Sequence, residues 1–204
     1  METRVGGKET RGQPAVVHAG RTVPPPAWTI GHSTLDLEEL HGRLLAHRID
    51  QVADVRRYPA SRRNPQFNRE TLATWLASRN LAYRWFEGLG GRRSGLPARE
   101  SPNRALSSAG FRRYADYMAT REFQTALAEL ISWLEEGRTA VMCAESLWWR
   151  CHRRLIADQL VARGGTVYHI RDPDSVERHE LWEVARVTPD GLFYPPRQTE
   201  MDLD

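Results

Sequence analysis

The feature of this 204-residue sequence that most constrains its fold is the regular alternation of short apolar runs with amphipathic stretches. The apolar runs have the length of strands, and the stretches between them carry apolar residues at helical spacing. Such alternation is typical of an α/β protein with a mostly parallel sheet and helices on both faces. Strands are expected at residues 28–30, 51–55, 82–86, 139–143 and 166–170, and helices at residues 35–47, 69–78, 111–135 and 148–163.

The two ends of the chain differ from this pattern. Residues 1–26 mix glycine, arginine and a run of three prolines without apolar periodicity, which predicts a flexible leader before a single α/β domain at residues 27–204. Two short strands within residues 181–194, around Pro189, Asp190 and Gly191, predict a small C-terminal hairpin at the edge of the sheet. Ser33 or Thr34 is expected to cap the first helix.

Composition excludes several classes of protein. Hydrophobic residues make up 40% and charged residues 27% of the chain, which predicts a folded core. No apolar run approaches the roughly 18 residues of a membrane helix, and the N-terminus lacks the apolar segment of a secretory signal. The two cysteines, Cys143 and Cys151, are too few for a disulfide framework. We therefore expect a cytoplasmic protein with reduced thiols and no membrane partner.

Positive charge is concentrated in the middle of the chain. Between Asp54 and Arg121 there are 14 arginines and five acidic residues, a net charge of +9, whereas the whole chain carries +3. Such asymmetry is typical of a surface that binds phosphates or other anions, although arginines on solvated helix faces would give the same count. A nucleic acid or a nucleotide is therefore the expected partner.

Ligands of open parallel sheets bind in the crevice beyond the carboxyl ends of the strands. This rule selects the segments that follow four of the expected strands, at residues 31–33, 54–57, 87–93 and 143–153. The unusual residues of the sequence lie in these segments, so the ligand crevice is expected there.

The segments after the first three strands carry candidate substrate-binding residues. At the first strand-to-helix turn, free backbone N–H groups attract an anion, unless the turn is an ordinary capped one. Asp54 either orients an arginine of its own loop or acts on the substrate as a carboxylate. Paired glycines let the backbone approach a ligand closely, but they lack the spacing of a P-loop or a dinucleotide fingerprint. The candidates for phosphate and base contacts here are His32, Ser33, Arg56, Tyr58, Ser61, Arg62, Phe67, Gly90, Gly91 and Arg92.

Segment 143–153, CAESLWWRCHR, allows three interpretations. Glu145 is a general acid/base, with His152 and Arg153 orienting an anionic substrate. Alternatively, Cys143 or Cys151 is a thiolate nucleophile. In the third interpretation the two cysteines and His152 bind a transition metal, with His32 as a possible fourth ligand. Because the spacing fits no CxxC-type zinc pattern, no metal and no cofactor are expected. For Cys151 taken alone, a core thiol that only packs is the favoured interpretation.

Five motifs follow one another between Trp28 and Ile170: TIGHST, DVRRYPASRRNPQFN, YRWFEGLGGRR, FRRYADYM and CAESLWWRCHRR. Their order resembles the bacterial and archaeal family called domain of unknown function family 488. The resemblance implies a compact α/β domain and a site, but no reaction. The family's motifs correspond here to Gly31, His32, Ser33, Asp54, Arg56, Pro59, Ser61, Gly90, Gly91, Arg92, Cys143, Glu145, Cys151, His152 and Arg153.

This chain departs from the family's pattern between Glu145 and Cys151. Family members often carry polar residues and a proline there, whereas this chain has SLWWR. Trp148 and Trp149 are therefore expected to stack on a base or to pack against the arginine-rich loops.

These observations lead to three functional hypotheses. The first is an enzyme, a hydrolase, that acts on a phosphate-bearing nucleotide or nucleic acid. Its most specific form is hydrolysis of the N-glycosidic bond of a modified or damaged base, as in DNA repair. The second is a non-catalytic nucleic-acid or nucleotide-binding module. The third is a thiol- or metal-dependent enzyme that uses Cys143, Cys151 and His152. The oligomeric state is left open.

For the first hypothesis, two groups of residues are expected at the site. The candidate catalytic residues are Glu145, Asp54, Cys143 and His152. The expected base-stacking residues are Tyr58, Phe67, Trp148 and Trp149, and Arg153 is expected to hold the charge of the substrate.

Overall fold

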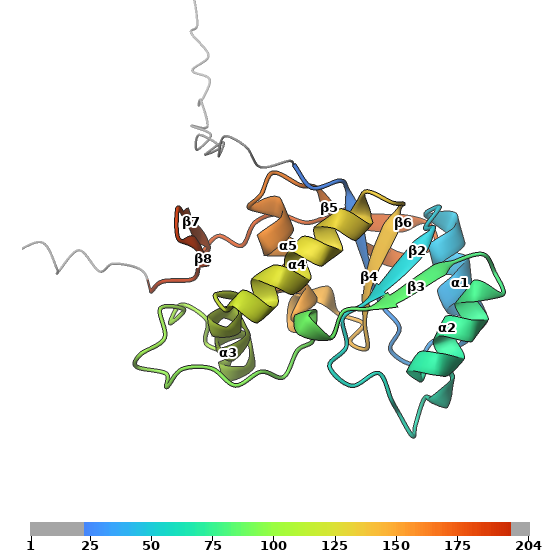
Figure 1. Cartoon of the computed structure of the whole chain (residues 1–204), viewed down its shortest axis with the longest axis horizontal. Helices are drawn as coiled ribbons and strands as arrows, with labels where there is room; N and C mark the ends of the chain where they lie inside the picture. Colours follow the sequence, from blue (N-terminus) through green and yellow to red (C-terminus); the bar gives the residue numbers. More distant parts are fainter. Residues whose placement is uncertain (1–22, 197–204) are drawn as a thin grey trace, which may run out of the picture.

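The computed structural model describes residues 23–196. Its centre is a six-stranded sheet with the strand order β3-β2-β4-β1-β5-β6 (Figure 1). All neighbouring strands from β3 to β5 are parallel, and β6 pairs antiparallel with β5, which confirms the expected mostly parallel sheet. The strands are β1 (Ala27–Gly31), β2 (Gln51–Asp54), β3 (Ala82–Trp85), β4 (Thr139–Cys143), β5 (Val167–Asp172), β6 (Ser175–Arg178), β7 (Arg186–Thr188) and β8 (Gly191–Phe193).

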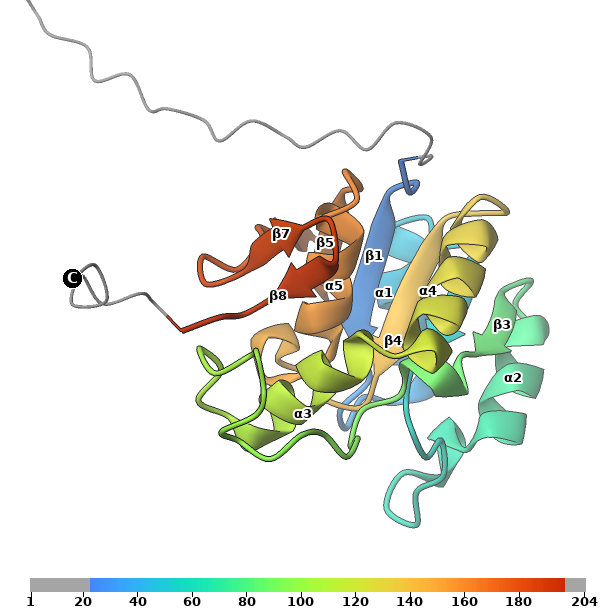
Figure 2. The ribbon, with the colours of Figure 1, turned by 60° about the vertical axis from the view of Figure 1, so that its left-hand side comes forward.

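Helices cover both faces of this sheet, as expected. Figure 2 shows α4 and α5 on the near side of the sheet and α1 behind it. The helices are α1 (Leu37–Ala46), α2 (Arg69–Ala77), α3 (Ala109–Met118), α4 (Arg121–Leu134) and α5 (Arg153–Val161), with 3₁₀ helices η1 (Pro65–Phe67), η2 (Glu87–Leu89) and η3 (Trp148–Arg150). No helix in residues 23–196 has the length and apolar character needed to cross a bilayer.

The core lies in two layers because strand side chains alternate between the faces of the sheet. Ile30 and Met142 pack with the buried leucines of α1 and α2. Val141 and Cys143 pack on the opposite face, with the buried residues of α3, α4 and α5. Both faces of the central strands are therefore buried, which accounts for their continuous apolar sequence.

The first helix begins later than expected. Its N-cap is Asp36, and not Ser33 or Thr34. Asp36 Oδ1 accepts from the backbone N–H of Glu39 at 2.7 Å, and Glu39 Oε2 accepts from the backbone N–H of Asp36 at 2.8 Å. This is a capping box, which satisfies two N–H groups at once and so outcompetes a single hydroxyl.

Two of the expected helices are interrupted. The helical region at residues 111–135 consists of α3 and α4, because α3 ends with Ala119 as its C-cap and Thr120 caps α4 by accepting from the N–H of Phe123. The helix expected at residues 148–163 is η3 followed by α5, with Cys151 between them in an extended conformation. Cys151 and His152 therefore precede α5, and they are not part of its regular turns.

The C-terminal hairpin was expected at the edge of the sheet, and this placement is wrong. β7 and β8 pair only with each other, in a separate two-stranded sheet, while β6 forms the edge. The hairpin packs through Leu192 and Tyr194 on the core layer that contains α5. The expected leader at residues 1–26 falls almost wholly outside the described residues; within its last four, Pro24 is buried.

The sheet topology places a crevice at the end of β4. This strand lies between β1 and β2, and the helices that follow those two strands, α1 and α2, pack on one face. The chain leaves β4 toward α5, on the other face. Neighbouring strands whose connections diverge to opposite faces leave a gap beyond their carboxyl ends, and such gaps hold ligands in open α/β sheets.

Candidate functional site

A pocket of about 860 Å³ opens at this crevice, where the sequence predicted it. Four separate segments line it, namely those that follow β2, β3 and β4 and the start of α3. The lining residues are Arg56, Arg57, Tyr58, Ala60, Gly91, Arg92, Arg93, Ser108, Gly110, Phe111, Arg113, Tyr114, Cys143, Ala144, Glu145, Arg150, Cys151 and His152.

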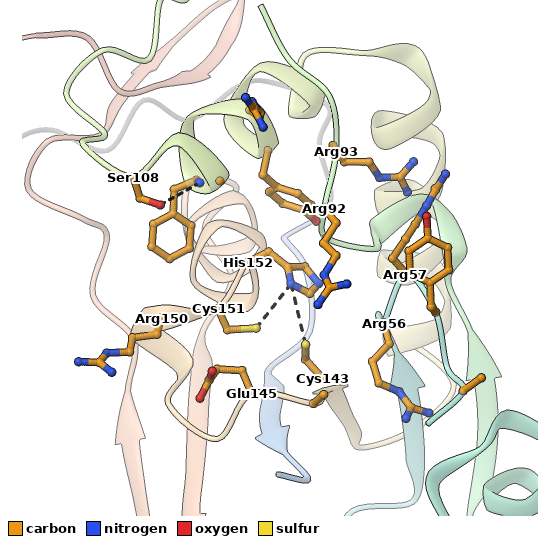
Figure 3. Close-up of a pocket in the computed structure, with 18 residues that line it drawn as sticks. Arg56, Arg57, Arg92, Arg93, Ser108, Cys143, Glu145, Arg150, Cys151 and His152 are labelled. Carbon is orange, nitrogen blue, oxygen red and sulfur yellow. Dashed lines mark hydrogen bonds between the residues drawn. The ribbon is translucent and has the colours of Figure 1, made fainter. Parts of the chain in front are cut away.

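The floor of the pocket holds two thiols and one imidazole. Both sulfur atoms point at the same ring nitrogen of His152 (Figure 3). Nδ1 of His152 lies 3.5 Å from Sγ of Cys151 and 3.9 Å from Sγ of Cys143. Nε2 lies 2.9 Å from the carbonyl oxygen of Val55, which can only accept a hydrogen bond. The neutral ring therefore carries its proton on Nε2 and presents the lone pair of Nδ1 to the thiols.

Packing fixes the orientation of this ring. A Cβ atom at Gly91 would lie 2.9 Å from Nδ1 of His152, so only glycine lets the backbone lie this close. The Tyr114 ring lies on the same imidazole, with a centroid separation of 5.1 Å. The paired glycines were expected to approach a ligand. Instead Gly91 contacts His152, and Gly90 lies against the backbone of Arg57.

The two thiols differ in their readiness to ionise. A hydrogen bond with Cys151 and burial together raise the pKa of Cys143. Burial also disfavours the thiolate of Cys151, but three groups outweigh it and lower its pKa: the hydrogen bond from Cys143, the positive charge of Arg153, and His152, which becomes positively charged when it accepts the thiol proton. If one thiolate forms, it is on Cys151.

Asp54 lies beside the pocket and not in it. It is fully buried, and its two oxygens accept from Nε and Nη2 of Arg56 and from the hydroxyl of Tyr83. Nη1 of Arg56 donates to Nε2 of His32 at 3.2 Å. Of the two interpretations of Asp54, the structure supports the orientation of an arginine in its own loop. The expectation that Asp54 reacts with substrate conflicts with this complete set of partners.

His32 is a positioning residue for Arg56. Its ring is buried and stacked on Phe67, with a centroid separation of 4.0 Å, and its Nδ1–H donates to the Ser33 carbonyl. Burial and the charge of Arg56 lower the pKa of His32 to about 4. His32 is therefore neutral at pH 7, and its Nε2 is free to accept from Arg56.

This shift predicts a loss of stability in mild acid. Because the folded state holds the pKa of His32 at about 4, below its ordinary value of 6.5, the unfolded chain binds the extra proton more readily as the pH falls from 6.5 to 4. Between pH 7 and pH 5 the cost is about 2 kcal/mol. Urea unfolding at both pH values should show this difference, and His32→Gln should remove that part of it. An unchanged pH dependence in His32→Gln would show that folding does not lower the pKa of His32.

Four arginines of the pocket have no ion-pair partner among residues 23–196: Arg57, Arg92, Arg113 and Arg150. Figure 3 shows Arg57 and Arg92 on one side of the two sulfur atoms and Arg150 on the other. Arg56 is paired with Asp54, and Arg93 with Glu122. Glu145 is the one acidic residue of the lining, so the pocket attracts anions.

Arg153 holds the loop after β4 in place from the protein interior. This side chain is 1% exposed and donates to the backbone carbonyls of Glu145 and Ser146. A Cβ atom at Gly31 would lie 2.0 Å from the Glu145 carbonyl oxygen, so this glycine makes room for the loop. Arg153 is thus a buried anchor and does not contact the pocket, contrary to the expectation that it holds substrate.

Glu145 projects into the pocket from this loop. Its side chain is exposed, and Oε1 accepts from the N–H of Leu147 at 3.2 Å. In Figure 3 the carboxylate lies beside Cys151. An exposed carboxylate in the lining of a pocket can accept a proton from a molecule bound there, which is the role of a general base.

Several expected base-stacking residues lie elsewhere. Phe67 is fully buried under His32. Trp148 stacks on His169 at a centroid separation of 3.9 Å, and Trp149 packs edge-on against Trp148. The expectations for Phe67 and Trp148 are wrong, because one ring is in the core and the other is stacked on a residue of β5. Trp149 is half-buried and does not line the pocket, and its stacking on a base stays a prediction. Tyr58 does line the pocket and is 66% exposed.

Three further candidates lie outside the lining. Ser61 bonds within its own loop, to the side chain of Asn68 and the backbone of Asn64. Arg62 is exposed, and Ser33 bonds through its N–H to the Ala144 carbonyl.

Sequence reasoning also missed several residues that line the pocket: Arg57, Arg93, Phe111, Arg113, Tyr114 and Arg150. The motif FRRYADYM, which contains Phe111, Arg113 and Tyr114, could have pointed to the three missed residues of α3.

The comparison with protein-family models gives one match. The model described as "Domain of unknown function DUF488" matches residues 36–160, more than half of the chain. The matched region includes every segment that lines the pocket. No curated protein and no solved structure matches the chain.

Proposed function

The chain belongs to the DUF488 family, and we propose that it is an enzyme acting on a phosphate-bearing nucleotide or nucleic acid. The observation that carries the proposal is the convergence of unpaired arginines on one pocket whose floor holds two thiols, an imidazole and a carboxylate. Anion-binding side chains and groups able to react therefore share one cavity, as an active site requires.

The arginines support a phosphate-bearing substrate. Guanidinium groups form two parallel hydrogen bonds with a phosphate, and Arg57 and Arg92 lie on the same side of the floor. Each arginine without a protein carboxylate keeps its charge available for the ligand. A substrate with at least one phosphate compensates this charge better than a neutral molecule.

Size and aromatic lining support a nucleotide. The pocket volume of about 860 Å³ is within the range of roughly 300–1,000 Å³ for small-molecule sites. Tyr58 offers an exposed ring, and Phe111 a partly buried one, in the same lining. Base–aromatic stacking tolerates any base, so the pocket's chemistry selects the class of substrate and leaves the base open.

The floor supports hydrolysis. Glu145 is positioned to take a proton from an attacking water, and the arginines stabilise negative charge on the substrate. Hydrolysis of an N-glycosidic bond stays a prediction. This reaction needs a carboxylate near the sugar, and Glu145 is the one carboxylate of the lining that can serve.

Thiol chemistry is the second candidate, favoured by one contact. Nδ1 of His152 lies 3.5 Å from Sγ of Cys151, so the imidazole can accept the thiol proton. In this candidate the thiolate bonds to the substrate and displaces a leaving group, which takes the proton held by His152, and water then hydrolyses the bond to sulfur and restores the thiol. The arginines keep the role just described.

A binding and turnover assay tests the proposal. A single-stranded oligonucleotide that contacts two to four of the unpaired arginines should lose affinity with a slope of about −1.5 to −3 in log affinity against log salt. Arg92→Gln should reduce the slope by about 0.7. Arg79→Gln should leave it unchanged, because Arg79 pairs with Glu38 and stacks on Trp75, away from the pocket.

Turnover is measured with nucleoside monophosphates and with oligonucleotides that carry uracil, hypoxanthine or an alkylated base. Release of base or phosphate by the wild-type protein is the expected result. A steep salt slope without any turnover would contradict the enzyme and favour a binding module. A flat slope together with no turnover would contradict the phosphate-bearing substrate.

A further inference from the structure

The two thiols and the imidazole of the pocket floor have the spacing of metal ligands. Their donor atoms, Sγ of Cys143, Sγ of Cys151 and Nδ1 of His152, all lie within 4.8 Å of one another. A tetrahedral zinc ion with its usual bond lengths sets its sulfur and nitrogen ligands about 3.6 Å apart. The observed separations from Nδ1 to sulfur, 3.5 and 3.9 Å, bracket this value.

His152 is already oriented as a metal ligand. A ligating histidine donates its second ring N–H to a carbonyl or a carboxylate, which fixes the tautomer and directs the other lone pair at the metal. Nε2 of His152 makes this bond with the Val55 carbonyl. The ring is held between Gly91 and Tyr114, so Nδ1 cannot turn away from the sulfur atoms.

Without a metal ion, only one of the two thiols can bond to the imidazole. The single lone pair of Nδ1 accepts from one thiol, and the other thiol is left to donate to sulfur, which is a weak acceptor. Both thiols are buried, with Cys143 8% and Cys151 4% exposed. A dipositive ion bound by two thiolates forms a neutral unit, which removes the cost of burying either thiolate alone.

We propose that Cys143, Cys151 and His152 form a three-ligand zinc site whose fourth position opens to the arginine-lined pocket. Binding converts two thiols to thiolates, so that Zn²⁺ enters, two sulfur–zinc bonds and one nitrogen–zinc bond form, and two protons leave to solvent. Three protein ligands and one open position are the arrangement of catalytic zinc sites, where the ion lowers the pKa of bound water to about 7.

The catalytic role of such an ion rests on the proposed function, whereas its binding does not. Glu145 lies beside Cys151 in the same pocket and would take the proton of a water held there. Sequence spacing gave no indication of zinc because one ligand ends β4 and the other two lie in the short break between η3 and α5. The expectation of no metal depended on a CxxC pattern that this arrangement does not need.

Cobalt substitution tests the site. The full chain is treated with a chelator, then titrated with Co²⁺ and afterwards with Zn²⁺, while its absorption spectrum is recorded. One Co²⁺ per chain should bind, with thiolate-to-cobalt charge-transfer bands and the intense visible bands of tetrahedral cobalt, and one Zn²⁺ should abolish them. Cys143→Ser, Cys151→Ser and His152→Gln should each lose these bands, and His41→Gln on α1 should retain them.

Two glycine-to-alanine substitutions, at Gly91 and at Gly42, give a test that keeps all three proposed ligands. Gly91→Ala places a methyl group 2.9 Å from Nδ1 of His152 and should weaken zinc binding about 10- to 100-fold, as other changes around a ligand do. Gly42→Ala is the matched control, since a Cβ atom there meets nothing within 4 Å. Equal zinc affinity in both variants would contradict the site.

The remaining outcomes separate the two proposals. A wild-type protein without charge-transfer bands, or bands that persist in His152→Gln, would overturn the zinc site. Turnover of a phosphate-bearing compound by protein that binds no cobalt would also overturn it, while the proposed function would stand. Cobalt binding at the three ligands without turnover of any such compound would support the site and contradict the proposed function.

Discussion

Asp54→Asn is expected to destabilise the protein by about 3–5 kcal/mol, the usual cost of leaving a buried charge without its partner. The carboxylate is fully buried, and Arg56, 6% exposed, donates to both of its oxygens. An asparagine side chain has the same shape but no charge, so the guanidinium would stay buried and unpaired. Urea unfolding at pH 7 measures the difference.

A surface ion pair provides the control for this substitution. Glu38→Gln removes the partner of Arg79, but Glu38 is 69% exposed, so the expected loss is below about 1 kcal/mol. If Asp54→Asn cost as little as Glu38→Gln, Asp54 would not be an anchor, and the catalytic role expected from the sequence would be open again.

Glu145→Gln is expected to lower kcat about 10²- to 10⁴-fold on whichever phosphate-bearing compound is turned over, the range for removal of a general acid or base. Folding should be unaffected, because Glu145 is exposed and a glutamine oxygen can still accept from the N–H of Leu147. KM and the salt dependence of binding should change little, since the arginines carry the affinity.

Glu135→Gln, at the end of α4, is the matched control and should leave kcat unchanged. If Glu145→Gln kept full activity while Cys151→Ser lost it, the carboxylate would have no role in proton transfer. The second candidate, with the sulfur of Cys151 as nucleophile, would then replace the first.

The expected bounds of the strands from β1 to β5 differ from the observed ones by no more than two residues at either end. The central strands β1 and β4 were predictable because they are buried on both faces and their apolar runs are continuous. The edge strand β3 is exposed to partly buried, but three of its four residues are apolar or aromatic. β6 was missed because residues 175–178 alternate between partly buried and exposed positions and include only one apolar residue, Val176. An edge strand of this composition has no periodic signal that distinguishes it from a loop.

The location of the site was predictable for a topological reason. Parallel strands end at the same edge of a sheet, so the residues after β2 and β4 had to meet there. The residues of α3 could not be placed in this way, because a connection of more than twenty residues separates Arg113 from β3. Only the fold shows that the start of α3 returns to the strand ends.

The direction of individual side chains was the least predictable property. Phe67 and Tyr58 belong to the same loop and the same residue class, yet Phe67 is fully buried and Tyr58 is 66% exposed. The Trp148 ring stacks on His169 and its Nε1–H donates to Glu177, two residues of distant strands that no local pattern indicates. Such choices depend on what other segments leave open, and periodicity carries no information about them.

A crystal structure of the protein soaked with a nucleoside monophosphate tests the central claim most directly. We expect the phosphate to contact Arg57 and Arg92, the base to lie on Tyr58, and the sugar to lie above Cys143, Cys151 and His152. A nucleotide bound on any other surface, or a pocket whose arginines turn to solvent and leave the phosphate without contacts, would contradict it.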